Sequence, residues 1–222
     1  IGPLWKPHFR IGYYFNWHAD KRCTFSTGRA VHNIGGKDLE RRKRTDAITE
    51  RLKDMNEKNR QKMKSYALRQ DILDIVYAGK TGHIGGDFSV IDILLALYNH
   101  MDITPENFES QDRDHFVLSK GHCVEALYAV LADKGFIRLK DVVATYSKFG
   151  SDYIGHPSNK IFGVEMNSGS LGHGLSVCVG MALAGKRLGK TYRVYTVMGD
   201  GELAEGSIWE AAMAASNFEL DN

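Results

Sequence analysis

The chain has 222 residues, of which 43% are hydrophobic and 25% charged, a composition typical of a globular protein that can bury one core. Its net charge of +2 is uneven, because residues 1–70 hold 17 Lys and Arg against 7 Asp and Glu, and the remainder holds 12 against 20. Three distant cysteines without a CxxC pattern argue against a disulfide scaffold or a zinc site, and no apolar run reaches the roughly 18 residues of a membrane span.

Residues 1–58 are predicted to form a basic N-terminal extension that is poorly ordered or helical. Its first part is aromatic and basic without a sustained period, and its second part has a charged helical pattern with few apolar positions. A basic, aromatic arm could also stack on nucleic-acid bases, an alternative that nothing downstream supports. The chain begins with Ile1 rather than Met and shows no signal-peptide layout, so we expect a fragment.

The compact part is predicted to begin near residue 60. Helical spacing of apolar residues predicts a helix over 63–79 that Gly79 can end. Residues 81–88 are interpreted as a glycine-rich turn, followed by a cap pair of Ser89 and Asp92 that opens an apolar, buried helix.

Beyond that helix, the pattern alternates short strands with helices. Strands are predicted at 115–119 and 191–198, and helices at 120–135, 139–149, 169–189 and 202–218. Trp209 and Met213, four residues apart in the last helix, are expected in the core. Strands separated by helices indicate an α/β fold in which helices cover a parallel sheet.

Asp200 stands between two glycines, where the second strand ends and the last helix begins. In open α/β sheets, ligands bind beyond the carboxyl ends of the strands, and glycines let the backbone turn sharply and approach a ligand closely. A helix start offers free N–H groups and a positive dipole end that suit a phosphate. A carboxylate is a hard oxygen ligand for Mg²⁺ or Ca²⁺. The combination predicts a metal–diphosphate site.

Five segments occur in the order and at about the spacing found in transketolases. They are TGHIGGDFSVIDILLALY (81–98), LSKGH (118–122), GHP (155–157), GSLGHG (169–174) and MGDGELAEG (198–206). The resemblance covers about residues 60–222, and GHIGGDFS and SLGHG look most like the N-terminal subunit of transketolases split into two chains. It implies a parallel-sheet, thiamine-diphosphate-binding α/β fold with helices on both faces. The diphosphate-binding domain would span 59–222 and be incomplete at its C-terminus.

The resemblance implies a metal and diphosphate role for the last motif. Asp200 would ligate Mg²⁺, with Ca²⁺ as a possible substitute, and the backbone of Gly201 would contact the diphosphate. Glu205 would lie beside the cofactor and take part in communication between sites.

The other motifs would supply the rest of the site. His122 would hydrogen-bond the diphosphate, and Gly169 and Leu171 would line the cofactor near its aminopyrimidine. His83 and His156 would face the sugar as catalytic residues, where imidazole suits proton handling near neutral pH. His83 would assist proton transfer, and His156 would bind the terminal hydroxyl end of the donor.

The resemblance also implies what lies elsewhere. The second metal ligand, an Asn, is expected beyond Asn222, and a C-terminal pyrimidine-binding subunit is expected to complete the site, so that this chain alone is inactive. A dimer or heterotetramer is expected, with the small-residue helix 172–185 as a candidate contact surface.

The implied activity is the thiamine-diphosphate- and Mg²⁺-dependent transfer of a two-carbon ketol unit from a ketose phosphate to an aldose phosphate. The expected setting is the pentose phosphate pathway in the cytoplasm, without a membrane or a nucleic-acid partner. Two alternatives stay open. A 1-deoxyxylulose-5-phosphate synthase-like enzyme is disfavoured by LSKGH and GHP, and a non-catalytic nucleic-acid-binding fragment would show a steep salt-dependent affinity for DNA.

Overall fold

The computed structural model describes residues 57–222, so the extension predicted over residues 1–58 lies outside the described residues except for its last two positions. The described elements are the helices α2 (Glu57–Gly79), α3 (Ile84–His100), α4 (Val124–Asp133), α5 (Leu139–Thr145), α6 (Gly174–Arg187) and α7 (Gly206–Asn217), the 3₁₀ turns η1 (Gly121–Cys123) and η2 (Gly201–Ala204), and the strands β1 (His115–Leu118) and β2 (Val194–Val197). Among them, no helix combines the length and apolar character needed to cross a membrane.

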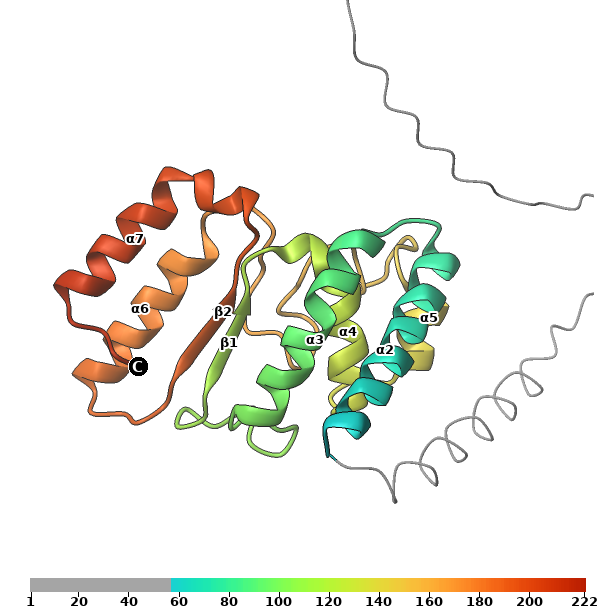
Figure 1. Ribbon diagram of the computed structural model, residues 1–222, viewed down its shortest axis with the longest axis horizontal. Helices are drawn as coiled ribbons and strands as arrows, with labels where there is room; N and C mark the ends of the chain where they lie inside the picture. The colour runs from blue at the N-terminus through green and yellow to red at the C-terminus, as the bar shows by residue number, and fades with distance from the viewer. Residues whose placement is uncertain (1–56) are drawn as a thin grey trace, which may run out of the picture. The chain divides into compact units, whose positions relative to one another are not determined.

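Strands β1 and β2 are parallel neighbours, with His115 opposite Val194 and Leu118 opposite Val197. Helices α3 and α4 lie on one side of the strands, and α6 and α7 lie on the other (Figure 1). The predicted parallel strands with helices on both faces are therefore confirmed. The chain end returns to this sheet, because the Val194 N–H donates to the Asn222 carbonyl at 2.8 Å.

The main core lies where α2, α3 and α4 pack together beside β1. Helix α4 is buried at every position from Val124 to Leu131. Helix α3, which is expected to be buried, buries one face and leaves Ile93 50% exposed on another. Helix α2 buries Leu68, Ile72 and Ile75, whose spacing places them on one helical face.

The start of α3 corrects the expectation of a glycine-rich turn over 81–88. Helix α3 begins at Ile84, and the Ser89 hydroxyl inside it donates to the Gly86 carbonyl at 2.8 Å instead of capping a later start. Close packing explains the glycine at position 86, since a Cβ there would lie 2.8 Å from Cys123 Sγ. Contact with η1 thus outweighs the cost of glycine inside a helix, which is about 1 kcal/mol.

The expectation that Trp209 and Met213 are core residues is wrong for the described structure. Their side chains are 62% and 65% exposed, and α7 buries Ile208 and Ala211 instead. The i, i+4 spacing correctly placed the two residues on one helical face, but it could not tell which face turns toward the core.

A long segment over residues 146–173 has no helix or strand, and a buried ion pair holds it to the start of β1. The Arg113 guanidinium, only 6% exposed, donates to both carboxylate oxygens of Glu165 and also to the Phe108 carbonyl. His115 Nδ1 lies 3.2 Å from Glu165 Oε1. Burial alone would raise the pKa of Glu165, but the hydrogen bonds from His115 and Arg113 and the Arg113 charge hold it below its usual value.

A lowered carboxyl pKa has a defined consequence for stability. Because the folded chain binds the proton of Glu165 less readily than the unfolded chain, this group stabilises the fold above its unfolded pKa. That contribution is lost as the pH falls through the folded pKa. The segment over 146–173 should therefore loosen first in acid.

Glu165→Gln tests this attachment. The change leaves Arg113 buried without a charged partner, so we expect the free energy of unfolding to fall by about 3 kcal/mol, measured by denaturant titration at neutral pH. Asp152→Asn is the matched control in the same segment. Its pair with Lys160 at 3.5 Å is exposed, so its loss should cost less than about 1 kcal/mol. Equal effects of the two variants would contradict the assignment.

Candidate functional site

Three loops meet at the carboxyl ends of the two parallel strands. Residues 119–123 follow β1, residues 198–205 follow β2, and residues 168–173 lead into α6. The backbone bond from Lys120 N–H to Val197 O at 3.2 Å and the bond from the Ser168 hydroxyl to Leu118 O at 2.7 Å fix these loops to the strand ends. This edge is where open α/β sheets bind ligands.

A buried carboxylate that the sequence analysis did not single out joins these three loops. Glu202 is 1% exposed, and its Oε1 accepts hydrogen bonds from the Ser119 hydroxyl at 2.5 Å and from Gly172 N–H at 2.9 Å. Its Oε2 accepts a bond from Gly199 N–H at 3.0 Å. A buried carboxylate is tolerated only when donors satisfy it, and here each donor comes from a different loop. No local sequence signal reveals this role, because two of its three partners, Ser119 and Gly172, are distant in the sequence.

The three histidines with predicted roles, His83, His122 and His156, lie near one another beside this junction. His83 precedes α3, His122 lies in η1, and their ring centroids are 5.5 Å apart at an interplanar angle of 65°. Burial lowers the pKa of His122, and the positive charges of Lys120, His83 and His156 lower it further. His122 is therefore uncharged at neutral pH and can act there as a hydrogen-bonding group.

Gly169 packs between His156 and the η1 turn. A Cβ on Gly169 would lie 2.1 Å from His156 Cδ2, and its φ of +123° is one that glycine adopts readily. A Cβ on Gly121 would lie 2.7 Å from the Gly169 backbone. The two loops thus approach each other closely only because both residues are glycines.

The remaining predicted residues lie on the exposed side of the Glu202 junction. Asp200 is exposed and precedes η2, and a Cβ on Gly201 would meet no atom within 4 Å, so this turn is open. Glu205 precedes α7 beside Gly172, whose Cβ would lie 2.9 Å from that of Glu205. Leu171 is 38% exposed. Most of the predicted residues thus lie on the three loops joined by Glu202, whereas His83 and His156 lie on other segments.

The donor set fits a metal ion carried by a diphosphate better than a dedicated metal cage. Within residues 57–222, no cluster of three or more His, Cys, Asp or Glu side chains could hold a metal ion. Mg²⁺ typically takes one or two carboxylates together with phosphate oxygens and waters. One exposed carboxylate beside an open glycine turn is compatible with that arrangement.

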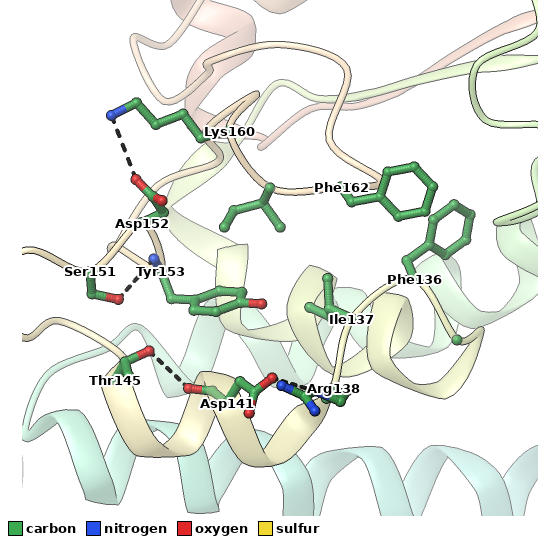
Figure 2. Close-up of a pocket in the computed structure, with 12 residues that line it drawn as sticks. Phe136, Ile137, Arg138, Asp141, Thr145, Ser151, Asp152, Tyr153, Lys160 and Phe162 are labelled. Atoms are coloured by element: carbon green, nitrogen blue, oxygen red, sulfur yellow. Dashed lines mark hydrogen bonds and ion pairs between the residues drawn. The ribbon is translucent and has the colours of Figure 1, made fainter.

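A separate hollow of about 470 Å³ lies over α5 and holds none of the predicted site residues. Figure 2 shows its charged side chains paired with one another, Arg138 with Asp141 at 2.6 Å and Lys160 with Asp152 at 3.5 Å. Phe136 and Phe162 close one end of it (Figure 2). Because its charges neutralise each other, the hollow offers no evident binding group.

Comparison with known families gives one match over most of the described chain. Residues 60–222 match the family described as "Transketolase, thiamine diphosphate binding domain". The match begins within α2 and therefore includes the three loops and all eight predicted site residues.

Named relatives are similar over the same part of the chain. The chain is 52% identical over 155 residues to an apulose-4-phosphate transketolase subunit of Phocaeicola vulgatus, covering 69% of this chain and 55% of that protein. It is 44% identical over 143 residues to a 6-deoxy-6-sulfo-D-fructose transketolase subunit of a Clostridium species, covering 64% and 52%. The chain thus spans about half the length of these relatives.

A solved structure supports the same relationship. A transketolase from Campylobacter jejuni superposes with a TM-score of 0.70 at 33% identity, covering 76% of this chain and 28% of that one.

Glu202→Gln tests the junction of the three loops. The amide nitrogen of Gln places a donor against one of the donors that now bind Glu202, so we expect the free energy of unfolding to fall by about 2 kcal/mol. Glu210→Gln, an exposed change on α7, should alter it by less than about 0.5 kcal/mol. Denaturant titration of both variants measures the difference, and an unchanged midpoint for Glu202→Gln would show that the carboxylate is not needed.

Proposed function

Because the chain belongs to the transketolase thiamine diphosphate binding domain family, we propose that it is the cofactor-binding subunit of a transketolase made of two kinds of chain. The reaction is the transfer of a two-carbon ketol unit from a ketose phosphate to an aldose phosphate. The observation that carries the proposal is the junction at Glu202, which holds the His122 loop, the loop with Gly169 and Leu171, and the Asp200 turn at one edge of the sheet.

Asp200, Gly201 and His122 bind the diphosphate end of the cofactor in this proposal. Asp200 ligates Mg²⁺, or Ca²⁺ in its place, and the open Gly201 turn lets the backbone approach the diphosphate. His122 contributes a hydrogen bond rather than a charge, since its lowered pKa keeps the free ring neutral. Gly169 and Leu171 line the rest of the cofactor, and Glu205 lies beside it and takes part in communication between sites.

When bound, thiamine diphosphate supplies the stabilisation of a carbanion, and the protein supplies orientation and proton handling. His83 and His156 perform the second task beside His122, since the His83 ring lies 5.5 Å from the His122 ring and the charge of His156 acts on it. His83 assists proton transfer at the reacting oxygen, and His156 binds the terminal hydroxyl end of the donor sugar. Both are exposed in the isolated chain and so can reach a substrate.

A second chain completes this site. Relatives that cover the same part of the family are named as transketolase subunits, which supports a partner that carries the pyrimidine-binding domain. The chain alone is then inactive, and the assembly is a dimer or heterotetramer. The small-residue helix over 172–185 suits a close contact, because a Cβ on Gly180 would meet nothing within 4 Å.

We propose that residues outside the described part of the chain determine which sugar substrate the enzyme uses. Relatives carry names that specify apulose-4-phosphate and 6-deoxy-6-sulfo-D-fructose, so the sugar differs among named members of the family. A cytoplasmic location and the pentose phosphate pathway are the setting we propose. An assay that offers pyruvate beside ketose phosphates separates this activity from that of a deoxyxylulose-phosphate synthase.

Asp200→Asn tests the proposed metal–diphosphate site. The change keeps the size of the side chain but removes the charge that Mg²⁺ needs, so we expect the affinity for thiamine diphosphate to fall about 100-fold, or about 2.7 kcal/mol. Calorimetric titration in Mg²⁺ of the full-length chain with its partner subunit measures it.

Asp152→Asn, an exposed change in the segment that precedes the site, is the control and should bind thiamine diphosphate like the wild type. The proposal fails if the wild-type assembly takes up no thiamine diphosphate. It also fails if Asp200→Asn binds it as tightly as the wild type does.

A further inference from the structure

The proposed function does not use two buried carboxyl groups, those of Asp87 and Glu125, which lie next to the turns that carry His83 and His122. Asp87 is in the first turn of α3 and Glu125 in the first turn of α4, and both are 0% exposed. Asp87 Oδ1 accepts a bond from Ala126 N–H at 3.2 Å, and Glu125 Oε1 accepts one from the Tyr146 hydroxyl at 2.5 Å. Asp87 Oδ2 and Glu125 Oε2 are sealed from solvent and find no other donor in the described chain.

A proton shared between the two carboxyl groups would give their unpartnered oxygens a hydrogen bond. Two ionised carboxylates in a dry core would repel each other and leave Asp87 Oδ2 and Glu125 Oε2 without donors, whereas one shared proton turns the contact into a hydrogen bond. Burial, and then the charge of Glu125, raise the pKa of Asp87 to about 8. The pair therefore holds its proton at neutral pH.

The other titratable groups that act on the pair do not replace this proton. Lys120 lies on the loop after β1 and favours ionisation of Asp87, but less than burial opposes it. Burial raises the pKa of the Cys123 thiol in η1 to about 11 and those of the Tyr128 and Tyr146 hydroxyls above their usual value. The side facing α2 is apolar, with Val76 at the Gly82 backbone.

The pair connects the two turns that carry the histidines. Asp87 N–H donates to the His83 carbonyl at 2.9 Å, which closes the first turn of α3. Glu125 follows His122 by three residues, and the backbone just before His83 rests on it, since a Cβ on Gly82 would lie 2.8 Å from Glu125 Oε1. Any separation of the two carboxyl groups must therefore move one histidine turn away from the other.

We propose that Asp87 and Glu125 share one proton and act as positioning residues that set the separation of His83 and His122. The inference rests on the proposed function of those two histidines. Loss of the proton puts two negative charges together in the core, and their repulsion drives the first turns of α3 and α4 apart. The enzyme should then lose activity at alkaline pH through geometry, without titration of a group that touches the substrate.

The experiment uses the full-length chain with its partner subunit and compares the wild type with Asp87→Asn and Glu125→Gln. Each amide keeps the size of the side chain and donates to the remaining carboxylate without a shared proton. Glu106→Gln, an exposed change, is the control. Infrared difference spectra detect the protonated carboxyl group, histidine-labelled NMR follows the rings of His83 and His122, and kcat/KM is measured against pH.

In the wild type and the control we expect the protonated carboxyl band to disappear with a midpoint near pH 8, matching the raised pKa of Asp87. The resonances of both histidines should shift, and kcat/KM should fall, with the same midpoint. In Asp87→Asn and Glu125→Gln the band should be absent, the histidine shift should vanish, and the alkaline fall should move by at least about one pH unit.

If the two residues have a purely structural role, both variants should be less stable, but the alkaline fall of kcat/KM should stay at the same pH. That outcome overturns the proposal. A carboxyl band that survives in Asp87→Asn also overturns it. The spectra and the histidine resonances need no substrate. A wild-type assembly that shows both transitions but transfers no ketol unit therefore contradicts the proposed function while supporting the shared proton and its effect on ring separation.

Discussion

The arrangement of the candidate site depends on one buried carboxylate, that of Glu202, which requires hydrogen-bond donors. Glu202 is buried away from solvent, and a buried carboxylate is tolerated only while Ser119, Gly172 and Gly199 donate hydrogen bonds to it. Those donors belong to the loop after β1, the loop before α6 and the loop after β2. Satisfying one side chain thus fixes three loops at the strand ends before any ligand arrives. A site organised in advance does not spend binding energy on ordering its own loops.

Three buried carboxyl arrangements in this fold use three kinds of partner. Glu202 is held by neutral N–H and O–H donors, and Glu165 by the Arg113 cation at the opposite end of β1. Asp87 and Glu125 each accept one such bond, from Ala126 N–H and from the Tyr146 hydroxyl, but their second oxygens find no donor among the described residues, so a shared proton takes that place. The third arrangement lies next to the turns that carry the two histidines whose spacing the proposed chemistry needs.

Sequence patterns predicted the parts of the structure that depend on local information. The two strands, their parallel pairing and the glycine turn at Asp200 follow from apolar runs and glycine positions, and the structure confirms the strands and their pairing. The start of α3 was misplaced because Gly85 and Gly86 resemble a turn, while close packing of Gly86 against Cys123 keeps them helical.

Residues defined by distant contacts escaped the sequence analysis. Glu202, Asp87 and Glu125 are ordinary acidic residues in the first turns of helices, and only the folded chain reveals that they are buried. The exposure of the Trp209 and Met213 side chains was missed for a similar reason, since helical spacing does not show which face of a helix a neighbouring element covers. The motif residues were found because glycine and histidine at fixed positions leave a local signature, although their roles remain proposals.

Amide hydrogen exchange at Gly172 and Gly199, in the protein without cofactor, tests the central claim most directly. If Glu202 organises the loops in advance, these two amides should exchange almost as slowly as the core amides of α4, because opening them requires exposure of a buried carboxylate. Exchange as fast as that of freely exposed loop amides, with protection only after thiamine diphosphate and Mg²⁺ are added, would show that the ligand rather than Glu202 builds the site.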